Sequence, residues 1–207
     1  DSSTSRGLGD VYKRQNIDDA AMKEACDLIR AGELVAFPTE TVYGLGADAL
    51  QPEASKKIYA AKGRPSDNPL IVHICRFEEL LSIAKEVPPQ AKKLADAFWP
   101  GPLTMIVWKN DRVPYETTGG MDTVAIRMPK HPVALRLIEG SGCLIAAPSA
   151  NTSGKPSPTE ASHVALDMDG RIPMILDGGP VGIGIESTIV DLSESTPMIL
   201  RPGYITQ

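Results

Sequence analysis

The stretch that decides the fold is Val35-Ala-Phe-Pro-Thr-Glu-Thr-Val-Tyr-Gly-Leu-Gly-Ala47. The apolar run from Leu34 to Phe37 predicts a buried strand, which Pro38 ends because proline has no N–H for a neighbouring strand. Polar groups and two glycines follow at once: Thr39, Glu40, Thr41, Tyr43, Gly44 and Gly46. Glycine lets the backbone approach another group closely, and polar side chains just after a strand are typical of ligand sites in α/β proteins. The alternative is an ordinary loop between a strand and a helix.

The rest of the chain alternates between helical and strand patterns. Apolar residues at helical spacing predict helices at 17–31, 52–62, 77–84, 89–98, 132–139 and 160–166. Short apolar or alternating runs predict strands at 34–37, 70–75, 103–108, 123–128, 144–147, 174–176, 188–192 and 198–200. The polar segment 109–122 is expected to be a loop. Because the last strands follow one another closely, we expect an α/β fold with a mixed sheet.

The composition is that of an ordinary globular protein. The 207 residues are 42% hydrophobic and 23% charged, and no apolar run approaches the roughly 18 residues that a membrane span needs. No secretory signal pattern is evident, so we expect a cytoplasmic protein. The three cysteines form no C-x-x-C pair, and the formal charge of −5 argues against a general nucleic-acid-binding surface.

The first fifteen residues do not resemble the rest of the chain. Asp10-Val-Tyr-Lys-Arg-Gln15 is similar to the translation of a transposon end used in preparing sequencing libraries. We therefore expect residues 1–15 to be a non-native scar and residues 16–207 to form the domain.

Several polar residues at element ends are candidates for ligand contacts. Lys62 and Arg64 flank a glycine at a predicted helix end, which suits a polyanion such as a triphosphate, although they could merely complement the helix dipole. Ser149 and Asn151 follow a strand and could bind phosphate or a nucleoside, or only serve the backbone of a turn. Arg127 lies on a predicted strand, where it is either solvated at an edge or a partner for a carboxylate ligand.

Other kinds of chemistry have no support in the sequence. His73 has apolar neighbours and suits a core position, and His131 and His163 form no metal-ligand spacing with it. The chain contains no G-x-x-x-x-G-K-[ST] motif, and Gly182-x-Gly184 lacks the third glycine of a dinucleotide fingerprint. No nucleophile has an adjacent base, so we expect neither a protein-bound metal nor covalent catalysis.

Four groups of residues together identify a family resemblance. They are Phe37-Pro-Thr-Glu-Thr-Val-Tyr-Gly-Leu-Gly46, Lys62-Gly-Arg64-Pro with Asn68-Pro, Pro148-Ser-Ala-Asn151-Thr-Ser-Gly, and Ile185-Glu-Ser-Thr-Ile-Val-Asp with Leu200-Arg-Pro-Gly. In this order, over about residues 20–205, they resemble the YrdC-like family of threonylcarbamoyl-AMP synthases. The resemblance implies a twisted, open mixed α/β sheet flanked by helices, with a concave ligand-binding face.

The resemblance also implies an activity and a set of site residues. Members of the family condense L-threonine, bicarbonate and ATP, with Mg²⁺, into threonylcarbamoyl-AMP and pyrophosphate, which feeds tRNA threonylcarbamoyladenosine formation by a downstream transferase. By this resemblance the residues that hold ATP are Lys62, Arg64, Asn68, Thr123, Ser149, Asn151, Ser157 and Arg201. Those that hold threonine are Thr41, His73, Arg127, the Ala147 backbone and Ser187.

The family resemblance leaves the extent of the protein open. Many relatives with this form of the first motif carry a linker and a smaller second domain after the Arg-Pro-Gly segment, whereas this chain stops at Gln207. It is either a single-domain member or a fragment. If a linker normally folds over the site, the activity of this chain would be reduced.

Two alternative functions compete with the synthase. One is a binding module for double-stranded RNA or tRNA without ATP turnover. The excess of acidic residues disfavours this function, so we expect any tRNA binding to be weak. The other is the carbamoyl-adenylate-forming domain of hydrogenase-maturation carbamoyltransferases, whose accompanying C-x-x-C modules are absent from this sequence. Use of carbamoyl phosphate in place of threonine and bicarbonate would identify that domain.

Overall fold

The structure is a computed structural model, and it describes residues 17–63, 65, 67–182, 185–203 and 205. The expected boundary after residue 15 lies outside the described residues, as does Arg64. No helix among the described residues is long and apolar enough to cross a membrane.

The deciding stretch folds as a β-hairpin. Strand β1 (Val35–Pro38) pairs antiparallel with β2 (Tyr43–Asp48), and the turn closes through bonds from the Thr39 N–H (3.1 Å) and hydroxyl (2.7 Å) to the Val42 carbonyl oxygen. The strand ends at Pro38 as expected, although Pro38 is itself the last residue of β1 and pairs with Tyr43. Strand β2 escaped the sequence analysis because it is buried on both faces and shows no polar alternation.

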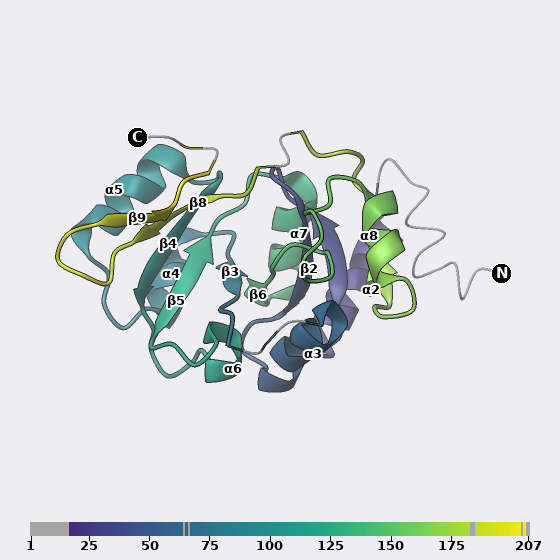
Figure 1. Ribbon diagram of the computed structural model, residues 1–207, viewed down its shortest axis with the longest axis horizontal. Helices are drawn as coiled ribbons and strands as arrows, with labels where there is room; N and C mark the ends of the chain where they lie inside the picture. Colours follow the sequence, from purple (N-terminus) through teal and green to yellow (C-terminus); the bar gives the residue numbers. More distant parts are fainter. Residues whose placement is uncertain (1–16, 64, 66, 183–184, 204, 206–207) are drawn as a thin grey trace.

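The strands form one mixed sheet, as predicted. Its order in the described residues is β7-β1-β2-β6-β3-β5-β4-β8-β9. The remaining strands are β3 (Ile71–His73), β4 (Leu103–Trp108), β5 (Thr123–Arg127), β6 (Ile145–Ala146), β7 (Met174–Ile175), β8 (Thr188–Asp191) and β9 (Met198–Arg201). The pairs β1–β7, β3–β5 and β4–β8 are parallel and the others antiparallel. Figure 1 shows β3 and β6 in the middle of the molecule, with β4, β5, β8 and β9 on one side and β2 on the other.

The helices begin and end close to where capping chemistry predicts. They are α2 (Asp19–Arg30), α3 (Pro52–Lys62), α4 (Phe77–Ile83), α5 (Pro89–Phe98), α6 (Tyr115–Thr118), α7 (Pro132–Ser141) and α8 (Ala161–Met168). The Asp18 carboxylate caps α2 by accepting a hydrogen bond from the Ala21 N–H at 2.8 Å. Gly63 ends α3 with φ +63°, a conformation that glycine adopts without strain. Helix α6 lies in the segment expected to be a loop, since one turn between Pro114 and Gly119 is too short for a periodic signal.

The core lies on both faces of the sheet. Val35 and Phe37 of β1 pack with α2 and α7 in one hydrophobic cluster, whereas Ala36 belongs to a second, larger cluster that includes Leu45 and Ile58. Because successive side chains of a strand point to opposite faces, the two clusters lie on opposite sides of β1. Because the centre of the sheet is tightly packed, the side chains of its central strands are held in fixed positions.

Candidate functional site

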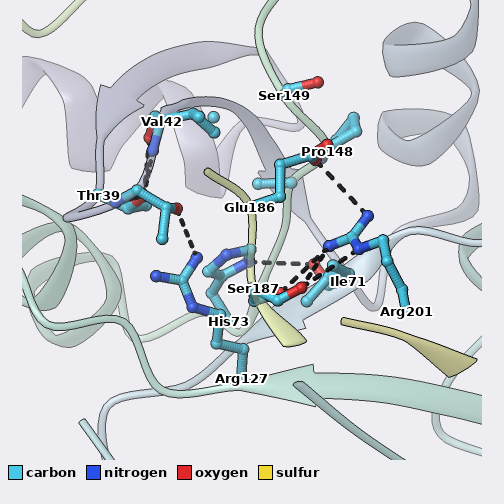
Figure 2. Close-up of a pocket in the computed structure, with 13 residues that line it drawn as sticks. Thr39, Val42, Ile71, His73, Arg127, Pro148, Ser149, Glu186, Ser187 and Arg201 are labelled. Carbon is cyan, nitrogen blue, oxygen red and sulfur yellow. Dashed lines mark hydrogen bonds and ion pairs between the residues drawn. The ribbon is translucent and has the colours of Figure 1, made fainter. Parts of the chain in front are cut away.

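Strand register brings the central polar side chains together. His73 of β3 pairs with Arg127 of β5, and Arg127 pairs with Thr104 of β4. The Thr104 hydroxyl lies 2.7 Å from that of Ser187, which immediately precedes β8. Residues separated by more than 100 positions thus form one row across the sheet. Figure 2 shows His73, Arg127, Ser187 and Arg201 gathered around a pocket above this row.

The pocket is lined by side chains from the hairpin, the sheet and two later loops. Its lining residues are Thr39, Thr41, Val42, Gly44, Ile71, His73, Arg127, Ala147, Pro148, Ser149, Glu186, Ser187 and Arg201. The lining therefore combines two guanidinium groups, a histidine and several hydroxyls.

Arg127 provides a buried positive charge at this pocket. Its guanidinium forms an ion pair with Glu40 and donates to Thr41 Oγ1 (3.3 Å) and the Gly101 carbonyl oxygen (3.3 Å). The second oxygen of Glu40 accepts a hydrogen bond from the Lys130 N–H at 3.1 Å. Burial lowers the pKa of Arg127 and the Glu40 carboxylate opposes this, so the guanidinium stays charged. The sequence left Arg127 either solvated or facing a ligand, and the structure gives it a buried position at the pocket.

His73 is neutral in this environment. Its Nδ1 lies 3.1 Å from the Ile71 carbonyl oxygen and 3.3 Å from that of Ile145, and carbonyl oxygens can only accept, so Nδ1 carries the proton. Burial, followed by the nearby charge of Arg127, lowers the pKa of His73 to about 3. Its Nε2 is therefore a hydrogen-bond acceptor.

The last two motifs of the chain are joined at the pocket. Arg201 donates to the Ser187 carbonyl oxygen through Nε (3.2 Å) and Nη2 (2.9 Å). Gly203 packs against the same backbone, where an added Cβ would lie 2.4 Å from the Glu186 carbonyl oxygen. The Leu200-Arg-Pro-Gly segment needs its glycine because two backbones meet there.

Lys62 holds the loop that follows β6. Its buried Nζ donates to the carbonyl oxygens of Ser149 (2.5 Å) and Asn151 (2.6 Å), and its own carbonyl oxygen accepts from the Ser153 N–H at 3.0 Å. The Asn151 amide nitrogen donates to two backbone carbonyls, whereas its Oδ1 is buried without a hydrogen-bond partner among the described residues. Lys62 is thus turned to the loop backbone.

The predicted site residues fall into two groups. Those that line the pocket are Thr41, His73, Arg127, Ala147, Ser149, Ser187 and Arg201. The other predicted residues that the structure describes do not line it: Lys62 and Asn151 form the loop contacts described above. Asn68 is exposed after α3, Thr123 begins β5 about 13 Å along the strand from Arg127, and Ser157 lines a separate surface pocket with His163. All five predicted threonine contacts therefore line one pocket, whereas the predicted ATP contacts are spread.

Sequence reasoning gave no role to several pocket residues. They are Val42, Ile71, Pro148 and Glu186, whereas Thr39 and Gly44 belong to the stretch that the sequence marked as typical of a ligand site. Val42 and Ile71 had no polar signal, but Glu186 directly precedes Ser187 and lies between a glycine-rich run and the strand that begins at Thr188. That position could have marked it as a site residue. Gly46, by contrast, faces the core, since an added Cβ would lie 2.7 Å from the Phe37 ring.

The fold and the pocket define a mixed α/β protein with a pocket at the centre of its sheet that is lined by two arginines, a histidine and several hydroxyls. The Sua5/YciO/YrdC family model, described as "Telomere recombination", matches residues 27–203. The chain belongs to this family, which confirms the resemblance found in the sequence.

Curated relatives and a solved structure agree with this assignment. The chain is 59% identical over 193 residues to a threonylcarbamoyl-AMP synthase from Pyrococcus abyssi and 56% identical over 205 residues to one from Bacillus subtilis. These alignments cover 93% and 99% of this chain but 57% and 59% of the relatives. The crystal structure of P. abyssi Sua5 complexed with L-threonine superposes with a TM-score of 0.89 over 92% of this chain and 56% of that one, at 59% identity. The chain thus spans little more than half the length of these relatives.

Proposed function

We propose that this chain condenses L-threonine, bicarbonate and ATP to threonylcarbamoyl-AMP and pyrophosphate. The observation that carries the proposal is the buried, charged Arg127 at a pocket that also contains neutral His73 and Ser187. A guanidinium is the natural partner of an amino-acid carboxylate. The names of the two relatives and the threonine complex of P. abyssi Sua5 support the same activity.

The threonine site that we propose is the pocket itself. Arg127 receives the carboxylate, and Nε2 of His73 accepts a hydrogen bond from the substrate hydroxyl. Thr41, the Ala147 backbone and Ser187 complete the site, and all three line the pocket. These contacts require a neutral His73, which its low pKa ensures at physiological pH.

The ATP site that we propose extends from the pocket over its surroundings. Ser149 and Arg201 stand at the pocket and would meet the α-phosphate, next to the threonine amine. The other proposed contacts are Arg64, Asn68, Thr123, Asn151 and Ser157. Lys62 contributes its positive charge to the same region while it holds the Ser149–Asn151 loop.

The reaction needs positioning and charge neutralisation rather than a protein nucleophile. The ammonium group of threonine first loses a proton to solvent. The free amine then attacks the carbon of bicarbonate, the C–OH bond breaks, and the hydroxyl leaves as water with the second proton lost from nitrogen. An oxygen of the resulting carbamate attacks the α-phosphorus of ATP. The bond between the α-phosphorus and the oxygen that bridges it to the β-phosphorus breaks, and pyrophosphate leaves. Arg201, Lys62 and Arg64 offset the charge that develops on the phosphates.

We propose that Mg²⁺ is carried by the phosphates of ATP. In the described part of the chain no three histidine, cysteine, aspartate or glutamate side chains gather to hold a metal ion. When bound, the ion supplies charge neutralisation to the departing pyrophosphate. We further propose that the product passes to the tRNA threonylcarbamoyl transferase machinery in the cytoplasm.

Pyrophosphate release tests the proposal. The full chain is supplied with ATP, Mg²⁺ and bicarbonate, with and without L-threonine, and we expect release that requires threonine. Release that requires carbamoyl phosphate instead would assign the hydrogenase-maturation type of chemistry. A chain that releases no pyrophosphate and binds no ATP, but binds RNA in a salt-dependent way, would contradict the synthase proposal and favour an RNA-binding module.

A further inference from the structure

One carboxylate in the pocket has no role in the proposed reaction. Among the described residues that line the pocket, Glu186 is the one with an acidic side chain. The carboxylate of Glu40, in contrast, is taken up by Arg127 and the Lys130 N–H. An acidic group at a site built to receive anions repels them. Glu186 forms a long ion pair with Arg201 (3.7 Å), and it can also attract a positively charged part of a ligand.

Glu186 is available to such a ligand. Its side chain is 44% exposed and its Oε1 lies 3.7 Å from Nη1 of Arg201, which is beyond direct hydrogen-bond distance. The Nε and Nη2 groups of Arg201 are instead turned to the Ser187 carbonyl oxygen. Glu186 therefore feels a nearby positive charge but keeps its oxygens open to another donor.

The positions of Glu186 and Arg127 suit the two charges of an amino acid. Ser187 follows Glu186 in the chain, and its hydroxyl contacts Thr104, the register partner of Arg127. Figure 2 shows the Glu186 carboxylate directed to Arg201, while the guanidinium of Arg127 lies apart from it beside His73. At neutral pH an α-amino acid carries both a carboxylate and an ammonium group. The pocket thus offers a group of the opposite charge to each.

We infer that Glu186 receives the ammonium group of the amino-acid substrate while Arg127 receives its carboxylate. The inference rests on the proposed function and deepens it, because it makes Glu186 a specificity-determining residue. The pocket would then select α-amino acids over carboxylates that lack the amine. The same carboxylate offsets part of the charge of Arg201, so its removal should leave the phosphate-binding side of the site more positive.

Calorimetric binding tests the inference. The full chain and its Glu186→Gln variant are titrated with L-threonine, with the hydroxy acid that has a hydroxyl in place of the amine, and with a non-hydrolysable ATP analogue. Threonine titrations are run with and without that analogue. We expect the variant to bind threonine about tenfold more weakly, which corresponds to the loss of one charge-assisted contact. It should bind the hydroxy acid and the nucleotide at least as tightly as the unmodified chain does.

Two further variants separate recognition from folding. Glu194→Gln makes the same change at an exposed position between β8 and β9, and we expect it to leave all three affinities unchanged. Glu186→Asp keeps the charge and should retain part of the threonine affinity. An equal loss of threonine and hydroxy-acid affinity in Glu186→Gln would overturn the inference and give Glu186 a structural role. Unchanged threonine affinity would also overturn it, whereas an unmodified chain that binds no threonine would overturn the proposed function as well.

Discussion

Arg127 and His73 show how two neighbouring side chains acquire opposite protonation behaviour in one buried site. Arg127 keeps its charge because Glu40, Thr41 and a backbone carbonyl satisfy it. His73 loses its charge because burial and the guanidinium both disfavour a second cation. A carboxylate ligand therefore meets one positive charge and one neutral acceptor at this end of the pocket.

The Arg127→Ala variant should lose threonine binding selectively. Removing one partner of a buried charge contact costs about 2–5 kcal/mol, so we expect at least about a 30-fold increase in the KM for threonine. The affinity for ATP should change much less. Kinetic titration of each substrate measures both effects. The matched control is Arg136→Ala, which removes an exposed arginine from α7, and equal losses for both substrates in Arg127→Ala would contradict the assigned role.

His73 should make the protein sensitive to mild acid. Its pKa is about 3 in the folded state, below the ordinary value of 6.5, so the unfolded chain binds more protons between these values. The contribution of neutral His73 to the free energy of unfolding is complete above about pH 6.5 and is lost as the pH falls. At about pH 5 the loss is about 2 kcal/mol. Thermal unfolding from pH 7 to pH 5 measures this loss. His73→Gln should show a smaller decrease in Tm than the unmodified chain, and the exposed His163→Gln should show the same decrease as the unmodified chain.

At the scale of elements, the hairpin of β1 and β2 organises the loops around the pocket. Its turn presents Thr39 and Thr41 to the pocket, and the backbone of Tyr43 bonds to Pro158 and Ala150 in the loop after β6. The Tyr43 hydroxyl donates to the Gly179 carbonyl oxygen (2.7 Å) and accepts from the Gly178 N–H (3.1 Å). One hairpin thus fixes the positions of two distant loops.

Gly46→Ala should destabilise this hairpin. The added Cβ would lie 2.7 Å from the Phe37 ring and 2.8 Å from Cγ2 of Ile145, both in the buried sheet. Overpacking of this kind costs about 1–3 kcal/mol, so we expect a lower midpoint of urea unfolding. Gly182→Ala is the control, since an added Cβ there meets no described atom within 4 Å. An unchanged midpoint for Gly46→Ala would show that Phe37 and Ile145 can move aside.

Prediction of the elements depended on their length and end chemistry. Helices α3 and α7 begin with proline and end before glycine, and both were found close to their true bounds. Strand β2 and helix α6 were missed because one is buried on both faces and the other is a single turn. Local sequence signals therefore identify elements that are amphipathic or capped. They miss a strand that is buried on both faces and a helix of a single turn.

At the scale of the whole molecule, the net negative charge disfavours polyanionic partners. The formal charge of −5 opposes close approach to a phosphate backbone, while the positive charges of Arg127 and Lys62 are buried. Two cationic side chains, Arg127 and Arg201, thus line the pocket of a chain whose net charge is negative.

We expect tRNA to bind the protein only weakly. At physiological salt, filter binding should give a dissociation constant no tighter than about 1 μM, the range of non-specific contacts. Threonine-dependent pyrophosphate release should proceed without RNA. A control titration in low salt should strengthen the binding, because the interaction is electrostatic. Tight, salt-dependent tRNA binding without pyrophosphate release would instead support the RNA-binding alternative.

The sequence by itself determined the mixed α/β class, most of the elements, the family and the polar segments of the site. These follow from local periodicity, capping residues and spaced motifs, which are properties of short stretches of chain. Only the tertiary structure decided that Glu40 pairs with Arg127, that Lys62 is turned to the loop backbone and that Glu186 faces the pocket. Each of these contacts joins residues distant in the chain, or depends on which way a side chain points after the sheet has formed. Strand register sets such contacts, and register is a property of the whole sheet.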